Sequence, residues 1–504
     1  MIPQKAYEEL VQRGREISTL ASSYAVLEWD HQVNMPPQGS ELRAEQTSQL
    51  YGIIHQIVTD PRIDELLHTC EDSDLMKDPE SIEAANIHEL RHQYDKEKKL
   101  PKDFVEEFQK TTSLAHNIWA EARGKNDFSI FKPSLDKILD MCRKKADYFG
   151  YEGEPYNALL DNYEPGATVE EIGVVFEKLQ VELVELLQKI QKASDKPDKT
   201  IIEREYDVNL QKIFGEMVAA SMGYDFKQGR LDIATHPFTI GMGPGDTRIT
   251  TRYNPKRIND ALFGTIHEAG HALYEMGLDK KNHFGTPVGE SASLGIHESQ
   301  SRMWENNVGR SRSFWNYYYP IAQRIFRKSL IDVSLDDFYR AVNFVEPSLI
   351  RVEADEVTYS LHIMLRFEIE RAMLKGEIKT ADVPGEWNSR FEKYLGIKVD
   401  SDRNGCLQDV HWSGGSIGYF PTYCLGSLYA AQFFAKAKKD MPDLDEQIGR
   451  GELLKLREWL RENIHKHGLR YRAGKLCEKV TGAPLSHKPM MDYLNTKFKE
   501  IYKL

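Results

Sequence analysis

The sequence predicts a mostly α-helical protein, with a large bundle-like helical body and a small β-hairpin. Three observations favour this fold class. Apolar residues recur at helical spacing through much of the chain, strand-like segments are scarce, and one short stretch holds two strand patterns around a glycine-rich turn. The chain has 504 residues, 40% of them hydrophobic and 29% charged, so it can bury a sizeable core. This composition excludes a disordered chain, a collagen and a small disulfide-rich domain.

The clearest helix is predicted to begin after Thr168. Thr168 and Glu171 have the spacing of a capping box, and the apolar residues behind them recur every three or four positions as far as Ile190. The polar residues 194–199 then predict a loop. Further helices are expected at 7–24, at 360–375 before Gly376, and at 452–467 before Gly468.

The strand signal lies between residues 234 and 253. Residues 238–240 and 248–253 flank the turn-forming residues 241–246, which predicts a β-hairpin. The same glycines suggest a phosphate cradle as an alternative, but no Gly-Lys-Ser/Thr follows them and no helix pattern opens directly behind them. The turn is therefore favoured. Because the chain contains no repeat and no long linker, we expect a single catalytic domain over residues 1–504.

Charge, cysteine content and hydropathy limit the partners and the location. The net charge of −12 argues against a nucleic-acid-binding protein. The five cysteines are scattered and form no CxxC pair, which is typical of reduced, intracellular thiols. The N-terminus has no apolar core of signal-peptide length, and no uncharged apolar run is long enough to cross a bilayer. We expect a cytoplasmic protein with no membrane partner.

The chemistry lies in residues 267–271, which form an H-E-x-x-H motif. On a helix, His267 and His271 lie on one face, one turn apart, which suits adjacent corners of a zinc tetrahedron. Glu268 lies off that face and can act on a water molecule without binding the metal. The alternative is that both histidines are ordinary core or surface residues. The flanking residues are apolar, however, and burying two histidines and a carboxylate costs free energy that a metal ion would offset.

A catalytic zinc ion takes a third protein ligand and keeps one position open. The position at which the metzincin pattern places a third histidine holds Gly277, so the ligand must come from elsewhere. The pattern of residues 294–304 predicts the helix that follows the metal helix. The candidate carboxylates are Glu290, Glu298 and Glu305, and spacing alone favours Glu298 only slightly.

These residues resemble the thermostable metallocarboxypeptidases of the carboxypeptidase Taq type. The resemblance rests on six blocks in order along the chain, residues 236–238, 246–250, 267–271, 297–300, 350–355 and 405–412. It implies that His267, His271 and Glu298 bind the metal and that Glu268 is the catalytic carboxylate. It also implies a helical body with a deep central groove, an active site built from residues 236–423, and assembly as a homodimer.

The predicted activity is hydrolysis of the C-terminal peptide bond of peptides by a metal-activated water, with Glu268 as general base and then general acid. Zn²⁺ is the expected ion, and Co²⁺ and Mn²⁺ are alternatives. A hydrogen-bond donor to the oxyanion is expected among His411, Tyr419 and Tyr423. The alternative for the two tyrosines is ordinary core packing.

An enzyme that removes C-terminal residues must bind a free carboxylate, which suits the two-pronged guanidinium of arginine. Arg248 and Arg351 lie in the family-like blocks and are the leading candidates, although any single arginine is by default a solvated charge. His236 is a further predicted substrate contact. Asp246 and Asp355 are expected either to orient a histidine or arginine or to cap a turn or helix. We expect the hairpin, just upstream of the H-E-x-x-H helix in the sequence, to lie next to that helix, and its strands offer edges along which a peptide backbone can align.

Other functions are weighed against this one. An endo-oligopeptidase or a dipeptidyl carboxypeptidase is the alternative among enzymes, because H-E-x-x-H does not encode exo- or endo-cleavage. A helical binding protein with a structural zinc ion is disfavoured, because such sites usually have four protein ligands, often including cysteine. No cysteine lies near residues 267–298. A phosphate-binding enzyme is the third class.

Overall fold

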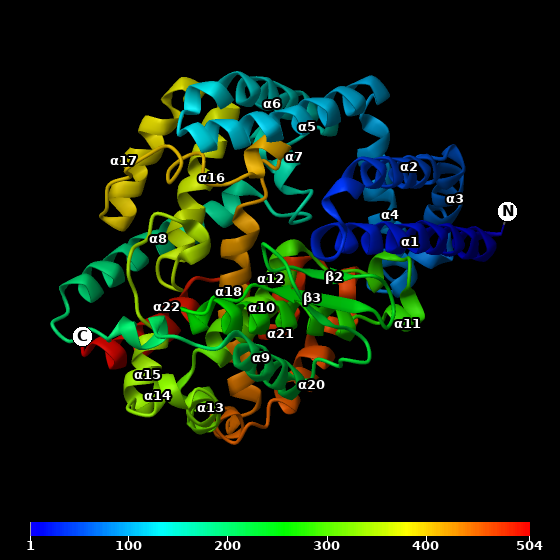
Figure 1. Ribbon diagram of the computed structural model, residues 1–504. Helices are drawn as coiled ribbons and strands as arrows, with labels where there is room; N and C mark the ends of the chain where they lie inside the picture. Colours follow the sequence, from blue (N-terminus) through cyan, green and yellow to red (C-terminus); the bar gives the residue numbers. More distant parts are fainter. Residues whose placement is uncertain (1) are drawn as a thin grey trace. The chain divides into compact units, whose positions relative to one another are not determined.

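The computed structural model describes residues 2–504. Helices account for most of this range, and its strands form one three-stranded sheet beside the helix that carries the H-E-x-x-H motif (Figure 1). The predicted fold class, a mostly helical body with a small sheet next to the metal helix, is confirmed.

The chain forms two compact units, each assembled from three segments. The first unit contains the residues up to Glu97 together with Asp198–Val342 and Phe433–Ala483. The second contains Lys98–Pro197, Asn343–Gln432 and Pro484–Leu504. Neither unit is continuous in sequence, which is why no linker marks a boundary. A single catalytic domain over the whole chain stays a prediction.

The first unit contains the sheet and the metal helix. Its helices are α1 (Pro3–Val33), α2 (Ser40–Val58), α3 (Pro61–Glu71), α9 (Val208–Met222), α10 (Ile258–Gly277), α11 (Lys280–His283), α12 (Leu294–Arg302), α13 (Arg312–Ile325), α14 (Arg327–Leu330), α15 (Leu335–Val342), α19 (Leu444–Gly449), α20 (Leu454–Asn463) and α21 (Ala473–Thr481). The helices of the second unit are α5 (Lys102–Lys125), α6 (Phe128–Phe149), α7 (Pro155–Leu160), α8 (Val169–Lys192), α16 (Tyr359–Lys375), α17 (Val383–Leu395) and α22 (Lys488–Tyr502). The segment boundaries near residues 97 and 432 fall inside α4 (Ile82–Lys99) and α18 (Pro421–Asp440).

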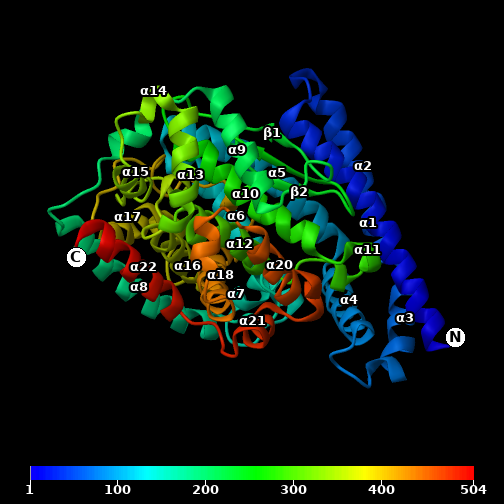
Figure 2. The ribbon, with the colours of Figure 1, turned by 90° about the horizontal axis from the view of Figure 1, so that it is seen from below.

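The N-terminal helices of the first unit enclose a small apolar core of their own. In Figure 2 the long helix α1 lies along α3, and α4 lies beside them. The buried side chains that these helices share are Ala6, Leu10, Ile63, Leu66, Leu67, Cys70, Ile87 and Tyr94. Their spacing of three or four residues within α1 and α3 is the pattern of an amphipathic helix that buries one face.

Helix α8 follows the sequence prediction. Thr168 caps it, because its side-chain oxygen accepts a hydrogen bond from the Glu171 amide at 3.3 Å. Most of the apolar face predicted from periodicity is buried, up to Ile190. Helix α16 also ends as predicted, with Gly376 in the left-handed conformation at φ 74°. Two other predicted helices differ in length: α1 extends over Pro3–Val33, and α20 ends at Asn463.

The sheet has the order β1-β3-β2, with β1 at Leu231–Ile233, β2 at Thr239–Gly241 and β3 at Thr247–Thr251. The predicted hairpin is confirmed as the antiparallel pair β2 and β3, in which Ile240 lies opposite Arg248. Strand β1, which pairs parallel to β3, was not predicted, because it has three residues and Ile233 is exposed. The sheet lies on α10, where the Thr251 hydroxyl donates to the Ala261 carbonyl at 3.3 Å.

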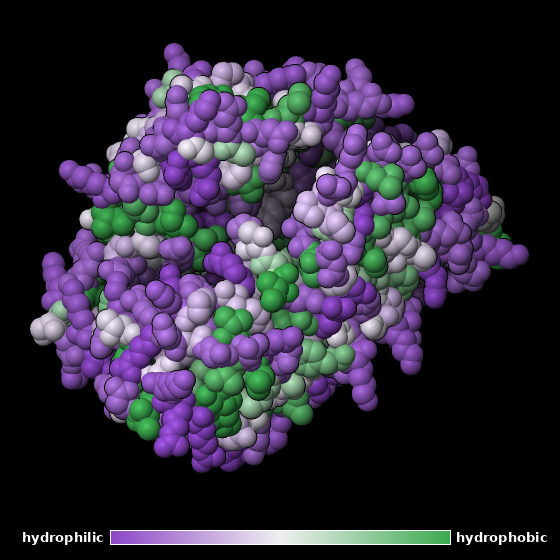
Figure 3. Space-filling model, in the orientation of Figure 1, coloured by the Kyte–Doolittle hydropathy of each residue, from purple (hydrophilic) through white to green (hydrophobic). Residues whose placement is uncertain are grey.

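The surface and the thiols agree with the composition. The face drawn in Figure 3 is mostly hydrophilic, with hydrophobic residues in small groups. Among residues 2–504, no helix combines the length and the apolar character needed to cross a membrane. All five cysteines are buried and unbonded to one another.

Candidate metal centre

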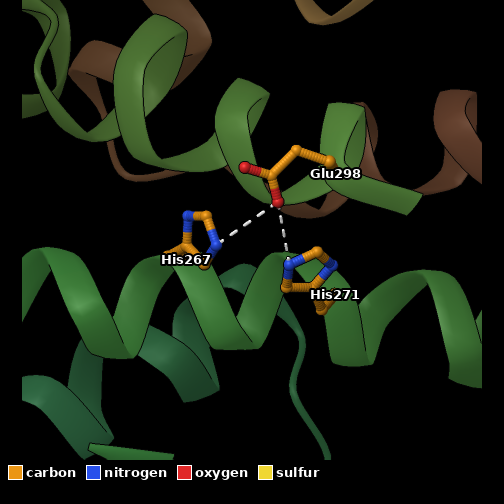
Figure 4. Close-up of side chains that lie close together, drawn as sticks. All are labelled: His267, His271 and Glu298. Atoms are coloured by element: carbon orange, nitrogen blue, oxygen red, sulfur yellow. Dashed lines mark ion pairs between the residues drawn. The ribbon is translucent and has the colours of Figure 1, made fainter. Parts of the chain in front are cut away.

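Two helices of the first unit bring three ligand groups together. His267 and His271 lie one turn apart on α10, with ring centroids 4.9 Å apart. Oε2 of Glu298, on α12, lies 3.6 Å from Nε2 of His267 and 3.2 Å from Nε2 of His271 (Figure 4). The donor atoms of these three residues all lie within 4.8 Å of one another. Of the three carboxylates that the sequence left open, Glu298 is therefore the one that faces both histidines.

The close approach of α10 and α12 depends on Gly270, which lies between the two histidines. A Cβ atom at Gly270 would lie 2.7 Å from Cα of Ser301 and 2.8 Å from the Gln300 carbonyl oxygen. Real Cβ atoms essentially never come this close to backbone. The glycine inside the motif therefore lets the backbone of α12 lie directly on α10, at the level where Glu298 meets the histidines.

Glu305 contacts the outer ring nitrogen of the proposed ligand His267. Its Oε2 lies 2.9 Å from Nδ1 of His267, the ring nitrogen that does not face Glu298. Glu305 belongs to the π-helix Met303–Gly309 that continues α12. Burial alone would raise the pKa of Glu305, but the charge of Arg302 and the hydrogen bond with His267 outweigh burial and lower this pKa to about 2. An ionised Glu305 fixes the His267 proton on Nδ1 and leaves the lone pair of Nε2 available to bind a metal ion.

Arg302 holds the carboxylate ligand. Its Nε donates to Oε1 of Glu298 at 2.7 Å, and the Ser301 hydroxyl donates to Oε2 at 3.0 Å. Burial opposes ionisation of Glu298, but the Arg302 charge overcomes it and holds the pKa of Glu298 well below its usual range. Because Arg302 occupies Oε1, Oε2 is the oxygen turned towards the histidines.

Glu268 is buried beside the ligand group. The Thr239 hydroxyl of β2 donates to its Oε2 at 2.7 Å. Burial raises the pKa of Glu268. The strand predicted to lie near the metal helix therefore contacts the proposed catalytic carboxylate directly.

The chemistry of these residues fits a divalent metal ion. Two imidazoles and one carboxylate are the ligands of many catalytic zinc sites, and the described residues place three such groups around one point. Each histidine directs Nε2 inwards and has a partner at Nδ1, Glu305 for His267 and His297 for His271. This is the arrangement expected of metal-binding histidines.

The candidates in the second unit also form a group. Rings of His411 and Tyr419 have centroids 5.3 Å apart, and Tyr419 and Tyr423 are separated by the same distance. The Tyr423 hydroxyl lies 3.5 Å from Nε2 of His411. Arg351 is buried, with its Cζ 5.0 Å from the centroid of the Tyr423 ring.

Arg351 shares its counter-ion with a second arginine. Its Nε and Nη2 donate to Oδ1 of Asp409 at 3.0 and 2.9 Å, while Nε of Arg366 donates to Oδ2 at 2.7 Å. Burial would raise the pKa of Asp409, but the two guanidinium groups hold it far below its usual range. Among the described residues, two buried arginines therefore pair with one carboxylate.

The remaining predicted residues have structural partners or lie at the surface. Arg248 on β3 forms two hydrogen bonds with Asp246, and its guanidinium lies 4.3 Å from the Trp29 ring centroid. His236 is exposed in the loop between β1 and β2. Asp355 accepts hydrogen bonds from the amides of residues 346, 357 and 358, so it has the capping role that the sequence left open.

Comparison with known proteins identifies the family. The model of the carboxypeptidase Taq (M32) metallopeptidases matches residues 9–498. The chain belongs to the M32 family. Among its relatives are thermostable carboxypeptidase 1 of Thermus thermophilus, 45% identical over the whole of both chains, and carboxypeptidase 1 of Bacillus subtilis, 40% identical over 99% of each.

Solved M32 structures have the same fold. The M32 carboxypeptidase of Deinococcus radiodurans superposes with a TM-score of 0.96 at 40% identity, covering 99% of this chain and 100% of that one. Metallocarboxypeptidase 1 of Trypanosoma cruzi gives a TM-score of 0.92 at 33% identity, covering 99% and 100%. The family resemblance that six short blocks indicated therefore extends over the whole chain.

Several residues around this M32 site were missed by sequence reasoning. Arg302 follows Glu298 by one helical turn and Glu275 follows His271 by one turn, so spacing along each helix was a usable signal for both. Thr239 had no such signal, because its contact with Glu268 joins a strand to a helix.

Proposed function

We propose that this M32 protein is a Zn²⁺-dependent carboxypeptidase that hydrolyses the C-terminal peptide bond of peptides and releases single amino acids. The convergence of His267, His271 and Glu298 beside the buried Glu268 is the observation that carries the proposal. The relatives from T. thermophilus and B. subtilis bear the name carboxypeptidase and match along the full length of the chain. Family membership makes the protein a metal-dependent peptide hydrolase.

Glu268 moves the proton in the proposed reaction. A bound zinc ion supplies Lewis-acid polarisation of the peptide carbonyl and makes water a nucleophile at neutral pH. Oε2 of Glu268 accepts a hydrogen bond from Thr239, so Oε1 takes up the proton of the attacking water and later delivers it to the leaving amine. The raised pKa of Glu268, caused by burial, favours both transfers because it lies closer to neutral pH.

Arg351 binds the C-terminal carboxylate of the peptide in this proposal. Arg351 and Arg366 share Asp409, so this buried group carries an excess positive charge. A buried unmatched charge is costly, and a substrate carboxylate would neutralise it. His236 and Arg248 are proposed as further substrate contacts.

We propose that the oxyanion is stabilised by a donor from His411, Tyr419 and Tyr423. Burial lowers the pKa of His411 to about 4, so its ring is neutral at pH 7 and donates from one nitrogen. The Tyr423 hydroxyl and Nε2 of His411 lie 3.5 Å apart, so two potential donors lie side by side, and one of them donates to the developing negative charge in this proposal.

The decisive experiment replaces Glu268 with Gln. Glu268→Gln keeps the shape and removes the proton acceptor, so we expect it to retain stoichiometric Zn²⁺ and to lose at least about 10²-fold in kcat. The matched control is Glu216→Gln on α9, the same chemical change on a helix that lies against α10. An active Glu268→Gln enzyme would contradict the assignment of Glu268.

A second experiment separates exo- from endo-cleavage. Peptides with free and amidated C-termini are compared at equal length, and we expect amidation to raise KM and abolish release of the last residue. Arg351→Met should remove the discrimination between the two peptides. Equal cleavage of both by the wild-type enzyme would favour the endo-oligopeptidase or dipeptidyl carboxypeptidase alternative.

Three further features belong to the proposal. Zn²⁺ is proposed over Co²⁺ and Mn²⁺ because two histidines and one carboxylate suit zinc, and metal analysis of the protein as purified tests this. A homodimer is proposed from the family resemblance and is tested by light scattering. A cytoplasmic location is proposed from the scattered, buried, unbonded cysteines and is tested by cell fractionation.

A further inference from the structure

His271 has an unusual partner at its outer nitrogen. Its Nδ1 lies 2.6 Å from Nδ1 of His297, the residue that precedes Glu298 on α12. The other ligand histidine, His267, instead meets a carboxylate, that of Glu305, at the same position. The two ligand histidines are therefore supported differently, one by a charged oxygen and the other by a second imidazole.

The proton positions along this contact follow from the geometry. Two ring nitrogens at hydrogen-bond distance need one proton between them, so one donates and the other accepts. Nε2 of His271 faces Oε2 of Glu298 at 3.2 Å, on the metal side of the ring. A histidine that binds metal through Nε2 carries its proton on Nδ1. His271 is therefore the donor, and Nδ1 of His297 is the acceptor.

The other ring nitrogen of His297, Nε2, contacts a carboxylate. With Nδ1 as acceptor, the ring of a neutral His297 carries its proton on Nε2, and Nε2 lies 2.9 Å from Oε1 of Glu275. Oε2 of Glu275 accepts a hydrogen bond from Lys280. All three side chains are largely buried, with exposed fractions of 19% for His297, 13% for Glu275 and 11% for Lys280.

The backbone of β2 packs against Glu275 and Lys280, at the end of this series of hydrogen bonds away from His271. A Cβ atom at Gly241 would lie 2.5 Å from Oε2 of Glu275 and 3.6 Å from Nζ of Lys280. Lys280 also lines a cavity of about 350 Å³ with Tyr94, Met242 and Glu290. The hydrogen bonds therefore run without a break from His271 on α10 through His297 on α12 to Glu275 on α10, and from there to Lys280 at the edge of the cavity.

We propose that His297, Glu275 and Lys280 form a positioning relay that keeps the His271 proton on Nδ1 and holds Nε2 of His271 towards the metal ion. Glu275 fixes the tautomer of His297, and Lys280 keeps Glu275 charged and in place. The relay rests on the proposed metal site, and its members are positioning residues that touch neither substrate nor reacting atoms. Loss of such a partner typically weakens metal binding about 10- to 100-fold.

The test measures Zn²⁺ affinity of the full-length protein by competition with a chelator. We expect His297→Ala, which removes the acceptor, to weaken Zn²⁺ binding about 10- to 100-fold. Glu275→Gln, which keeps an acceptor oxygen but removes the charge, should weaken binding by a smaller factor. The spectrum of the Co²⁺-loaded protein should change in His297→Ala, because the ligand ring is no longer held.

The matched control is His465→Gln. His465 is also a buried histidine whose ring contacts Tyr274, but its Nε2 lies 2.9 Å from Gln300. The His465→Gln substitution should lower the melting temperature of the metal-free protein and leave the Zn²⁺ affinity at the wild-type value. If His297→Ala does not fold, Glu275→Gln decides the question in its place.

The outcomes separate the relay from the metal site. Wild-type affinity in a folded His297→Ala or Glu275→Gln protein would overturn the relay while leaving the metal site intact. Failure of the wild-type protein to bind one Zn²⁺, or undiminished binding by His271→Ala, would overturn the proposed metal site itself. A loss confined to the relay variants, with His465→Gln unaffected, is the result that supports the relay.

Discussion

The Thr239 hydroxyl lies 2.7 Å from Oε2 of Glu268 and 2.9 Å from the Glu268 carbonyl oxygen. The middle of the H-E-x-x-H motif is therefore attached to β2 through one side chain. This contact holds one carboxylate oxygen and leaves the other for proton transfer.

We predict that Thr239→Val lowers kcat/KM about 10-fold without changing Zn²⁺ affinity. A hydrogen bond to a charged group contributes about 1.5–3 kcal/mol, and its loss lets the Glu268 carboxylate rotate away from the reacting position. Thr239→Ser keeps the hydroxyl and should retain most of the activity. Steady-state kinetics with a free-carboxylate peptide measures both variants, and equal activity in Thr239→Val and wild type would refute the prediction.

We predict that Gly270→Ala destabilises the protein and impairs metal binding. The new methyl group would meet the backbone of Ser301 and Gln300, so α12 must move away from α10, at a cost of about 1–3 kcal/mol. The control is Gly173→Ala on α8, where a Cβ atom meets nothing within 4 Å. That substitution should stabilise the helix by about 0.5–1 kcal/mol. Thermal unfolding compares the two, and opposite signs are the expected result.

We predict that removal of the metal lowers the melting temperature and that Zn²⁺ restores it. An ion that binds only the folded state stabilises it by about 4 kcal/mol at a free concentration about 1,000 times Kd. In His271→Ala the difference between chelator-treated and Zn²⁺-supplied protein should largely disappear. A full-sized Zn²⁺ effect in this variant would place the stabilising ion elsewhere.

We predict that the stability of the protein falls with rising pH through Glu370. This fully buried carboxyl accepts hydrogen bonds from Tyr156, Trp412 and the Gly418 amide, yet burial raises its pKa to about 7 from 4.5. Between these values the folded state holds a proton that the unfolded state releases, so this stabilisation is complete below pH 4.5 and is lost as the pH rises through 7. The loss is on the order of 3 kcal/mol.

Glu370→Gln tests this prediction, because the amide keeps the shape and does not titrate. Its melting temperature relative to wild type should rise between pH 5 and pH 8. Glu392→Gln, which makes the same chemical change at an exposed position on α17, is the control for the substitution itself. A pH-independent difference for Glu370→Gln would contradict the raised pKa of Glu370.

Patterns within one helix could be predicted from the sequence. The cap and buried face of α8 and the placement of His267 and His271 on one face of α10 follow from helical spacing alone. Strand β1 could not be predicted, because its partner is β3 and its three residues carry no alternation of their own. The division of the chain into two units was also hidden, since each unit draws on three separated segments.

The sequence by itself determined the helical fold class, the family, and a metal helix with His267, Glu268 and His271. Spacing along the helix left Glu298 and Glu305, two turns apart, both open, and the family resemblance pointed to Glu298; only the tertiary structure gives the physical reason for this choice. The close contact at Gly270 brings Glu298 to both Nε2 atoms, and the π-helix after α12 places Glu305 behind His267. Helical spacing is local and can be read from a sequence, whereas the approach of two helices depends on packing between residues distant along the chain.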